Sequence, residues 1–424
     1  MPITATDACP RCDTSLTSVA DGPPWCGACE WNLDTFAPAP GVGWVWRRIG
    51  RWDSRAGFRV DRRIVEAYQR DPDGPVPKGG FRFLVALSAL LMVLLVAAVA
   101  AGIWLIVRGA GLPFIRLGAL LIGAAWLLRP RLGRLKNALR GVHVVSPEQA
   151  PAVHALVERI AGETGAPVPD VIAFDYSWNA YAGVVGLRRT KVLVLGVRLL
   201  LALEPQHLVA LIGHELGHFH HEDGHRRLLT QPALTAFGRL SSALRPPPGN
   251  ALDRGMTGLY ALVFVAWQLV GGTVSLLLFA AHLALHILDS PIRRRTELRA
   301  DAMAVRAAGS TAALGLVDLF PLLPELSGYV QQHVPEDRRP DEHWRRMLTV
   351  ARDREMASAP LRRQLSIRSG ASLFTSHPTP GRRHQWISGL PQTAAAVVVG
   401  ADEATRIEQE LIPYAAALYR RMKD

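Results

Sequence analysis

Charged residues are absent from one long stretch of this 424-residue chain, residues 83–107, and residues 255–288 contain no Asp, Glu, Lys or Arg. With 49% hydrophobic residues and a mean hydropathy of +0.14, this argues against a purely water-soluble enzyme. Cysteine is scarce too: the chain has four, all between residues 9 and 29. This excludes a disulfide framework for the rest of the chain.

The basic residues that give a formal net charge of +12 lie beside the apolar stretches. Arginines gather before residue 83 and after a second apolar segment, residues 112–128. Such flanks set the orientation of membrane helices more often than they mark a nucleic-acid surface. A lipid bilayer is therefore the expected partner, and nucleic acid is not.

Residues 81–130 are predicted to form a transmembrane helical hairpin. The 83–107 stretch is long enough to cross a bilayer core. The 112–128 segment is shorter and carries Arg116, whose side chain is able to reach the interface from near the helix start. Arginines at both outer ends place those ends in the cytoplasm. More than eighty residues precede the first apolar run, which argues against a secretory signal.

The cysteines form two Cys-x-x-Cys pairs, Cys9 with Cys12 and Cys26 with Cys29. This spacing is typical of a zinc ribbon, in which four thiolates hold a structural Zn²⁺ ion. Two disulfides in an exported domain are the alternative, which the apparently cytoplasmic flank disfavours. We expect a zinc ribbon over residues 1–36 and a basic linker over residues 37–80.

The most informative motif lies on a predicted helix that begins at Pro205. His214 and His218 are four residues apart, so they project on the same side and are placed to bind one tetrahedral metal ion. Glu215 then lies close enough to act as general base and acid toward a water molecule. An ordinary amphipathic helix with two surface histidines is the alternative.

Two histidines leave a catalytic zinc one protein ligand short. The best candidate is Glu297, and Asp301 lies one helical turn later, where it is placed to orient a ligand histidine. Taken by themselves, the two acids fit better a solvated pair beside the neighbouring arginines.

A site that joins Glu297 to the two histidines requires an even number of membrane crossings between them. Two paths provide this. Either residues 228–244 form a second membrane span despite Arg239, or residues 255–288 fold back on themselves near Gly271 and Gly272. A helix lying in the membrane without crossing it is a further alternative. A hairpin of some kind is favoured.

Around the motif, a helix is expected from Ser146 to about Gly162, followed by strands at residues 168–175, 179–186 and 191–196. A peptide is able to bind at the edge of such a sheet as an added strand. The predicted fold is mainly α with a small β-sheet, together with transmembrane helices and the ribbon.

Residues 146–390 resemble the integral-membrane zinc metallopeptidases of the HtpX and CaaX-prenyl-protease type. The resemblance rests on separated elements in the right order, beginning with the membrane hairpin. The others are Asn179-Ala180-Tyr181-Ala182, similar to the family's Asn-Ala-Phe-Ala strand, the His214–His218 motif followed by Asp223, Glu297 with Asp301, and His377-Pro378 with Arg383.

The resemblance implies a zincin-like domain over residues 140–424, with membrane segments within 228–288. It implies that His214, His218 and Glu297 bind the catalytic Zn²⁺ and that Glu215 is the general base and acid. The remaining implied roles are substrate binding by Asn179, Ala180 and Tyr181, support of the ligands by Asp301 and Asp223, and stabilisation of the oxyanion or of the site by His377 and Arg383.

The expected function is that of a membrane-embedded zinc endopeptidase of protein quality control. It would cleave membrane or damaged proteins at the cytoplasmic face of the inner membrane, which the chain crosses several times. The alternative is a non-enzymatic membrane adaptor whose ribbon recruits a partner. The intact set of two histidines and two glutamates disfavours it, because a scaffold has no need of an ionisable base beside metal ligands.

The other histidines near these elements are not expected to take part in the chemistry. His220, His221 and His225 are interpreted as a polar helix end. His282 and His286, four residues apart in the third apolar region, are interpreted as a pair facing a wet cavity or an interface rather than a second metal site.

Overall fold

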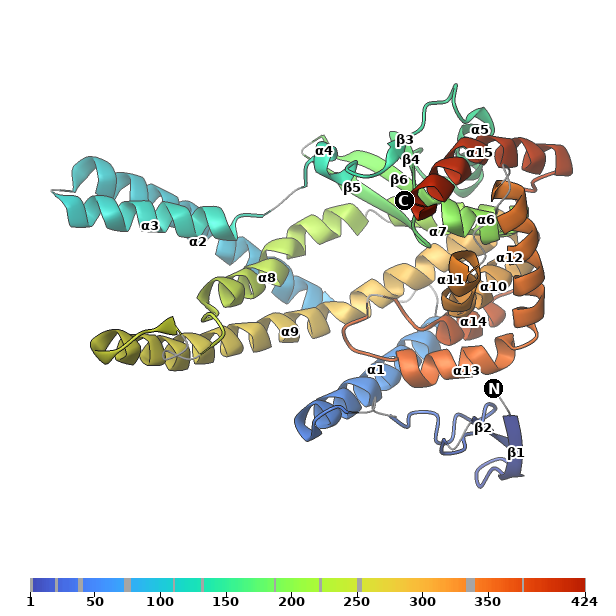
Figure 1. The fold of residues 1–424 in the computed structure, drawn as a ribbon, viewed down its shortest axis with the longest axis horizontal. Helices are drawn as coiled ribbons and strands as arrows, with labels where there is room; N and C mark the ends of the chain where they lie inside the picture. Colours follow the sequence, from blue (N-terminus) through green and yellow to red (C-terminus); the bar gives the residue numbers. More distant parts are fainter. Residues whose placement is uncertain are drawn as a thin grey trace. The chain divides into compact units, whose positions relative to one another are not determined.

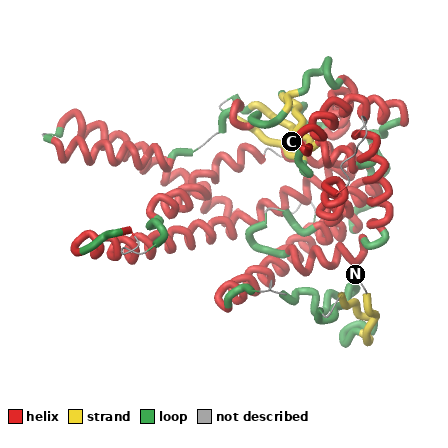
Figure 2. The backbone as a smooth tube through the Cα atoms, in the orientation of Figure 1, coloured by secondary structure: helices red, strands yellow, loops and turns green. Residues whose placement is uncertain are grey.

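The computed structural model describes residues 3–19, 22–36, 41–71, 78–109, 111–130, 133–186, 188–220, 223–249, 254–332, 340–375 and 377–423. The chain is mostly helical with a small β-sheet, as predicted (Figure 2). It divides into two compact units. Unit 1 comprises Met1–Gly74, Gly133–Gly224 and Arg293–Asp424, and unit 2 comprises Pro75–Leu132 and His225–Ile292.

A four-stranded sheet with the strand order β3-β4-β6-β5 lies in unit 1. Strands β4 (Val171–Asp175) and β6 (Thr190–Gly196) are parallel and central, with runs of buried aliphatic residues. Strands β3 (His143–Val144) and β5 (Ala180–Val185) pair antiparallel at the two edges. The three predicted strands are confirmed to within three residues at their ends.

Most of unit 1 is helical (Figure 1). Among its helices are α4 (Leu135–Ala138), α5 (Pro151–Thr164), α6 (Val197–Ala202), α7 (Pro205–His220), α10 (Ser310–Leu319), α11 (Leu323–Gln332), α12 (Pro340–Met356), α13 (Ala359–Gly370), α14 (Pro380–Ser388) and α15 (Ala401–Lys423), with a 3₁₀ turn at Phe320–Leu322.

The predicted motif helix is the centre of the hydrophobic core. Every residue of α7 from Leu208 to Gly217 is buried, and the helix packs against α5, α10 and β5. Burial on all sides is unusual for a helix that carries three polar motif residues, and it distinguishes α7 from an amphipathic surface helix.

The helix expected from Ser146 begins later, at Pro151. Ser146 does bond to Gln149, as in a capping box, since its amide donates to Gln149 Oε1 at 3.0 Å. The helix itself is capped from a distance: the amides of Ala152 and Val153 donate to the carboxylate of Glu410 at 2.7 and 3.0 Å. The true cap therefore comes from α15, 258 residues along the chain from Ala152.

The amino-terminal segment of unit 1 differs from the expected linker. Strands β1 (Ile3–Ala8) and β2 (Ser15–Val19) form a two-stranded antiparallel sheet, and residues within 37–80 form a 27-residue helix, α1 (Trp44–Arg70). The many arginines of this segment made its composition look like that of a linker. One face of the helix is nevertheless buried against α13 and α14, with Phe58, Ile64, Val65 and Tyr68 facing inward. The segment is thus a packed element and not a tether.

In unit 2, the predicted hairpin is present as α2 (Lys78–Arg108) and α3 (Leu112–Leu128), which pack against each other. At their contact the position of a Cβ on Gly102 lies 2.7 Å from the Gly118 carbonyl oxygen, so the close approach depends on glycine. Helix α8 (Asp223–Leu244) packs beside α2, where the amide of Ala233 donates to Ser88 Oγ at 3.1 Å.

The long apolar region 255–288 does not fold back. It belongs to one continuous helix, α9 (Gly258–Ala308), which passes through Gly271 and Gly272 without a break. Its partner is α8, because the hydroxyls of Ser241 and Ser275 exchange hydrogen bonds between the two helices. Residues 228–244 therefore pair with α9, whereas the number of membrane crossings between the two metal motifs stays a prediction.

Three helical stretches among the described residues are long and apolar enough to cross a membrane: Gly79–Arg108, Gly258–Ala308 and Ser310–Gln332. In the first two, only 6% and 11% of the most apolar part of the helix is buried inside the protein, whereas in the third 44% is buried. Its leucines belong to the core of unit 1. Burial in protein accounts for the apolar character of Ser310–Gln332 without a membrane.

Candidate metal centre

The last turns of α9 bring the predicted acids to the motif helix. Two glycines of α7 allow the helices to touch: a Cβ on Gly213 would lie 2.9 Å from Ala307 Cβ, and one on Gly217 would lie 2.9 Å from Ala300 Cα. Such close helix contacts require glycine at the interface. The spacing of these glycines, four residues apart, places His214 and His218 beside α9.

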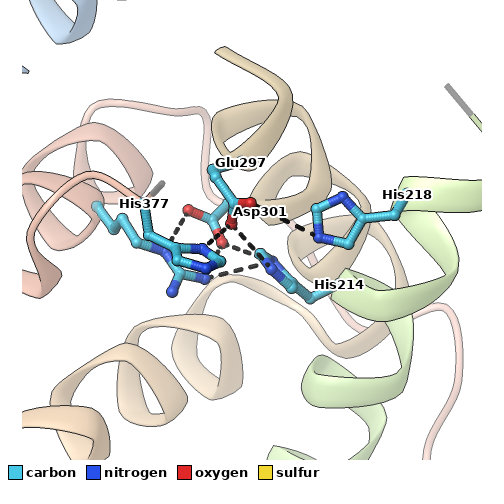
Figure 3. Close-up of polar contacts among 6 residues, drawn as sticks. His214, His218, Glu297, Asp301 and His377 are labelled. Carbon is cyan, nitrogen blue, oxygen red and sulfur yellow. Dashed lines mark hydrogen bonds and ion pairs between the residues drawn. The ribbon is translucent and has the colours of Figure 1, made fainter. Parts of the chain in front are cut away.

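His214, His218 and Glu297 converge, and their nearest ligand atoms all lie within 4.8 Å of one another (Figure 3). The two imidazole Nε2 atoms approach different oxygens of the same carboxylate, at 3.4 Å from His214 to Oε2 and 3.8 Å from His218 to Oε1. Tetrahedral ligands about 2.0–2.2 Å from a metal ion stand roughly 3.3 Å apart. The observed separations are close to this value, so the three side chains fit a single divalent ion.

Asp301 contacts His214 on the side of the ring that faces away from the three converging ligand atoms. Its Oδ1 lies 2.9 Å from His214 Nδ1, and only 1% of the Asp301 surface is exposed. An imidazole that donates from Nδ1 to a carboxylate presents Nε2 to a metal. Asp301 thus fixes the ring so that Nε2 faces Glu297.

Arg383 holds Asp301 in turn. Its Nε donates to Asp301 Oδ2 at 2.9 Å, its Nη2 donates to Oδ1, and that Nη2 also lies 3.2 Å from His214 Nδ1. The Arg383 side chain is buried. Burial lowers its pKa, but the charge and hydrogen bonds of Asp301, together with the charges of Glu297 and Glu215, outweigh burial and raise the pKa above its ordinary value. Of the two roles expected for Arg383, this geometry supports the one that stabilises the site.

His377 lies on the more open side of the same group. Its Nδ1 stands 2.6 Å from Glu297 Oε2, yet its side chain is 58% exposed. Figure 3 shows its ring beside Glu297, opposite His218. A cationic or hydrogen-bonding group at this position is accessible to a ligand that enters from solvent.

Electrostatics in the metal-free centre favour a proton on His214. Burial and the charge of Arg383 lower the pKa of His214, but the hydrogen bonds with Asp301 and Glu297 outweigh both and raise it to about 9. At neutral pH the imidazole of His214 is therefore protonated, and its positive charge stands in for that of a bound metal ion. The carboxylates therefore create a site that attracts positive charge.

Glu215 is one residue beyond His214 on α7 and is buried. The predicted substrate strand is β5, where Ala180 pairs with Leu195 and Tyr181 with Val194. Asn179 precedes the strand, and its carbonyl accepts from the Gly196 amide at 2.9 Å. Since β5 is an edge strand that packs against α7, an added peptide strand would lie beside the motif helix.

The sequence also singled out Asp223 and five further histidines. Asp223 begins α8, and its side chain lies outside the described residues, as do His221 and the side chain of His225. His220 Nδ1 lies 3.0 Å from the Gly165 carbonyl oxygen. The rings of His282 and His286 are 4.5 Å apart, but the pair joins neither group of three or more candidate ligands among the described residues.

The sequence did not point to two further charged residues near the centre. Arg294 lies one turn before Glu297 within a run of arginines, and it is fully buried. Its Nε is 2.5 Å from Oδ1 of Asp61 in α1, which is 1% exposed. No local pattern signals this pair, because the two residues meet only through the packing of α1 on the unit.

The four cysteines form the second group of candidate ligands. Cys9 Sγ lies 3.5 Å from Cys29 Sγ, and Cys12 Sγ lies 3.5 Å from Cys26 Sγ, which exceeds a disulfide bond length. Hydrogen bonds with Thr14 lower the pKa of Cys12 to about 6, whereas burial raises the pKa of Cys29 to about 12. This donor set fits a tetrahedral metal ion better than two disulfides.

Comparisons with known proteins agree with this geometry. Residues 147–390, more than half of the chain, match Peptidase family M48. The chain is 30% identical over 238 residues to a protein named Protease HtpX homolog from Acidiphilium cryptum, which covers 54% of this chain and 75% of that protein.

Two further proteins named Protease HtpX homolog are similar. That of Methanothermobacter thermautotrophicus is 34% identical over 117 residues, or 27% of this chain and 43% of that protein. That of Gemmatimonas aurantiaca is 28% identical over 202 residues, or 46% of this chain and 67% of that protein. No solved structure matches significantly. With its apolar helices and the M48 match, the chain belongs to peptidase family M48 and is a membrane metallopeptidase of the HtpX type.

Proposed function

We propose that this protein is a zinc-dependent endopeptidase that cleaves membrane or damaged proteins at the cytoplasmic face of the inner membrane. The observation that carries the proposal is the convergence of His214, His218 and Glu297 beside Glu215. Two imidazoles and one carboxylate are a common ligand set of catalytic zinc, and they leave one position for water.

Bound zinc would acidify a water molecule and polarise the carbonyl of the scissile peptide bond. Glu215 accepts the proton of the attacking water and later donates it to the leaving amine. Asp301 and Arg383 keep the His214 ring in place throughout, and His377 is placed to stabilise negative charge on the substrate oxygen. The substrate backbone adds to the edge strand β5 near Asn179, Ala180 and Tyr181.

The arginine flanks of the apolar helices support the cytoplasmic orientation of unit 1. The reduced thiols that the cysteine group needs support it as well, since the cytosol keeps cysteines reduced. The cysteine group would then hold a second, structural zinc ion. The other candidate function is that of a membrane adaptor. Because the amino-terminal segment packs on the peptidase unit, we propose recruitment of a partner only as a role in addition to proteolysis.

The purified protein in detergent is expected to carry two zinc ions per chain and to cleave casein or a membrane protein. Replacing Cys12 and Cys26 together by Ser should leave one zinc ion, because half of the thiolates are lost. Elemental analysis measures the stoichiometry, and a strong chelator should stop cleavage until zinc is restored. Cleavage that persists in metal-free protein would rule out the proposed chemistry.

The stability of the metal-free protein should fall as the pH rises from about 7 to about 9. The pKa of His214 in the folded protein is about 9, above its ordinary value of 6.5. Protonation therefore stabilises the fold fully below about pH 6.5, and this contribution is lost as the pH rises through 9. Thermal unfolding at several pH values measures it.

The control is His214→Gln, in which this fall should be much smaller. Zinc should have the opposite effect, because it displaces the His214 proton and so stabilises the protein more as the pH rises. An identical pH dependence in the wild type and in His214→Gln would contradict the assignment of the fall to His214.

A further inference from the structure

Two buried arginines flank the centre without belonging to it. Arg382 immediately precedes Arg383, and Arg294 lies one helical turn before Glu297. Arg382 is 2% exposed and Arg294 is fully buried. Each has a carboxylate partner, Glu30 and Asp61, from the amino-terminal segment that lies outside the residues matched to family M48.

Glu30 of the cysteine region makes a two-oxygen contact with helix α14. Nη2 of Arg382 donates to Glu30 Oε2 at 2.8 Å, Nη1 donates to Oε1, and Gln385 Nε2 donates to Oε1 at 3.1 Å. The Arg382 guanidinium also stacks over Phe58 of α1, 4.8 Å from the ring centroid. Burial raises the pKa of Glu30, but the Arg382 contacts outweigh it and lower the pKa. Glu30 is thus charged and fixed on α14.

The cysteine region is seated on α13 by apolar contacts as well. Trp25 is 1% exposed, packs with Phe58 and Ile367, and donates from Nε1 to Gln364 Oε1 at 2.7 Å. A Cβ on Gly27 would lie 2.2 Å from Gln364 Nε2, so the two surfaces are in close contact. Packing this close is typical of a protein core and not of a flexibly tethered domain.

Asp61 acts on the chain that leads into α14. Its partner Arg294 donates to the Ser372 carbonyl and to Thr375 Oγ1, the latter at 3.3 Å. Beside it, Asp53 of α1 accepts the Leu373 amide at 2.9 Å. Helix α1 therefore fixes residues 372–375, which lie shortly before His377.

We propose that Glu30 and Asp61 are positioning residues of the peptidase centre: they fix, through Arg382 and Arg294, the segment that carries His377 and Arg383. Glu30 directly follows Cys29 and has the left-handed φ of 59°, so an ion held by the cysteines would fix the backbone that presents Glu30 to Arg382. Without that ion, Glu30 would be released from Arg382 and α14 would be loosened. The inference rests on the proposed peptidase activity.

Glu30→Gln is expected to lower kcat about tenfold and to change KM less than twofold, because support of a ligand is weakened and no substrate contact is lost. Both zinc ions should remain. Amide hydrogen exchange in α14 should become faster at least about tenfold, which reports the loosening directly. The matched control is Glu66→Gln on α1, which removes exposed i,i+4 ion pairs with Arg62 and Arg70 and should change neither quantity.

A double-mutant cycle separates positioning from a general loss of stability. If Glu30 acts through Arg382, then Arg382→Gln alone and the double variant each lose about tenfold in kcat, and the two losses do not multiply. Cys29→Ser should give the same loss of kcat and the same faster exchange in α14.

Wild-type kcat in Glu30→Gln, or losses that multiply in the double variant, would overturn the inference. Inactive wild-type protein would instead refute the proposed function. Hydrogen exchange in α14 then still decides whether Glu30 holds this helix, since it does not depend on turnover.

Discussion

Replacing Glu215 by Gln is expected to lower the rate of peptide-bond cleavage about a thousandfold while both zinc ions stay bound. Glutamine keeps the shape of this buried side chain but accepts no proton from the attacking water. The loss should fall on kcat, because the proton transfer belongs to the reaction step and not to substrate binding. Cleavage of casein by matched amounts of protein measures it.

The control for this variant is Glu163→Gln, which removes an exposed carboxylate on α5 and should leave the rate unchanged. Zinc content must be compared in the same preparations, since a lost ion would mimic a lost base. Turnover within tenfold of the wild type in Glu215→Gln, with zinc present, would exclude Glu215 as the general base.

Replacing Glu297 by Ala is expected to remove one of the two zinc ions and all measurable cleavage. The carboxylate faces both imidazoles, so its loss leaves two ligands, which is one fewer than a catalytic zinc site uses. We expect the affinity for the zinc ion at His214 and His218 to fall by more than about a hundredfold, the upper effect of losing a supporting partner. Competition with a coloured chelator measures this affinity.

Asp301→Asn provides the graded comparison. It keeps the three metal-facing side chains and weakens only the support of His214, so zinc affinity should fall by about 10–100-fold. Equal affinities in Glu297→Ala and wild-type protein would show that the carboxylate does not bind the ion.

The sequence predicted the parts of the site that depend on short-range periodicity. His214 with His218, and Glu297 with Asp301, are each four residues apart, and a helix turns this spacing into a shared face. The strands near Ala173, Gly183 and Val194 followed from their aliphatic runs and the turn residues between them. The convergence of the two helices came from family resemblance and not from spacing.

Contacts between segments that are far apart in the chain could not be predicted from the sequence. The start of α5 depends on Glu410, the burial of Arg294 depends on Asp61, and the packing of α1 depends on α13 and α14. The arginines of residues 44–70 masked an inward face whose apolar residues are few. The path of residues 255–288 was open because glycines interrupt helices in some contexts and allow close packing in others.

The most direct test is to locate the ion by anomalous scattering at the zinc absorption edge in crystals of the zinc-loaded protein. The account predicts a peak about 2.0–2.2 Å from Nε2 of His214, Nε2 of His218 and a carboxylate oxygen of Glu297. A zinc peak bound by the two histidines but far from Glu297, or no peak at this site, would contradict it.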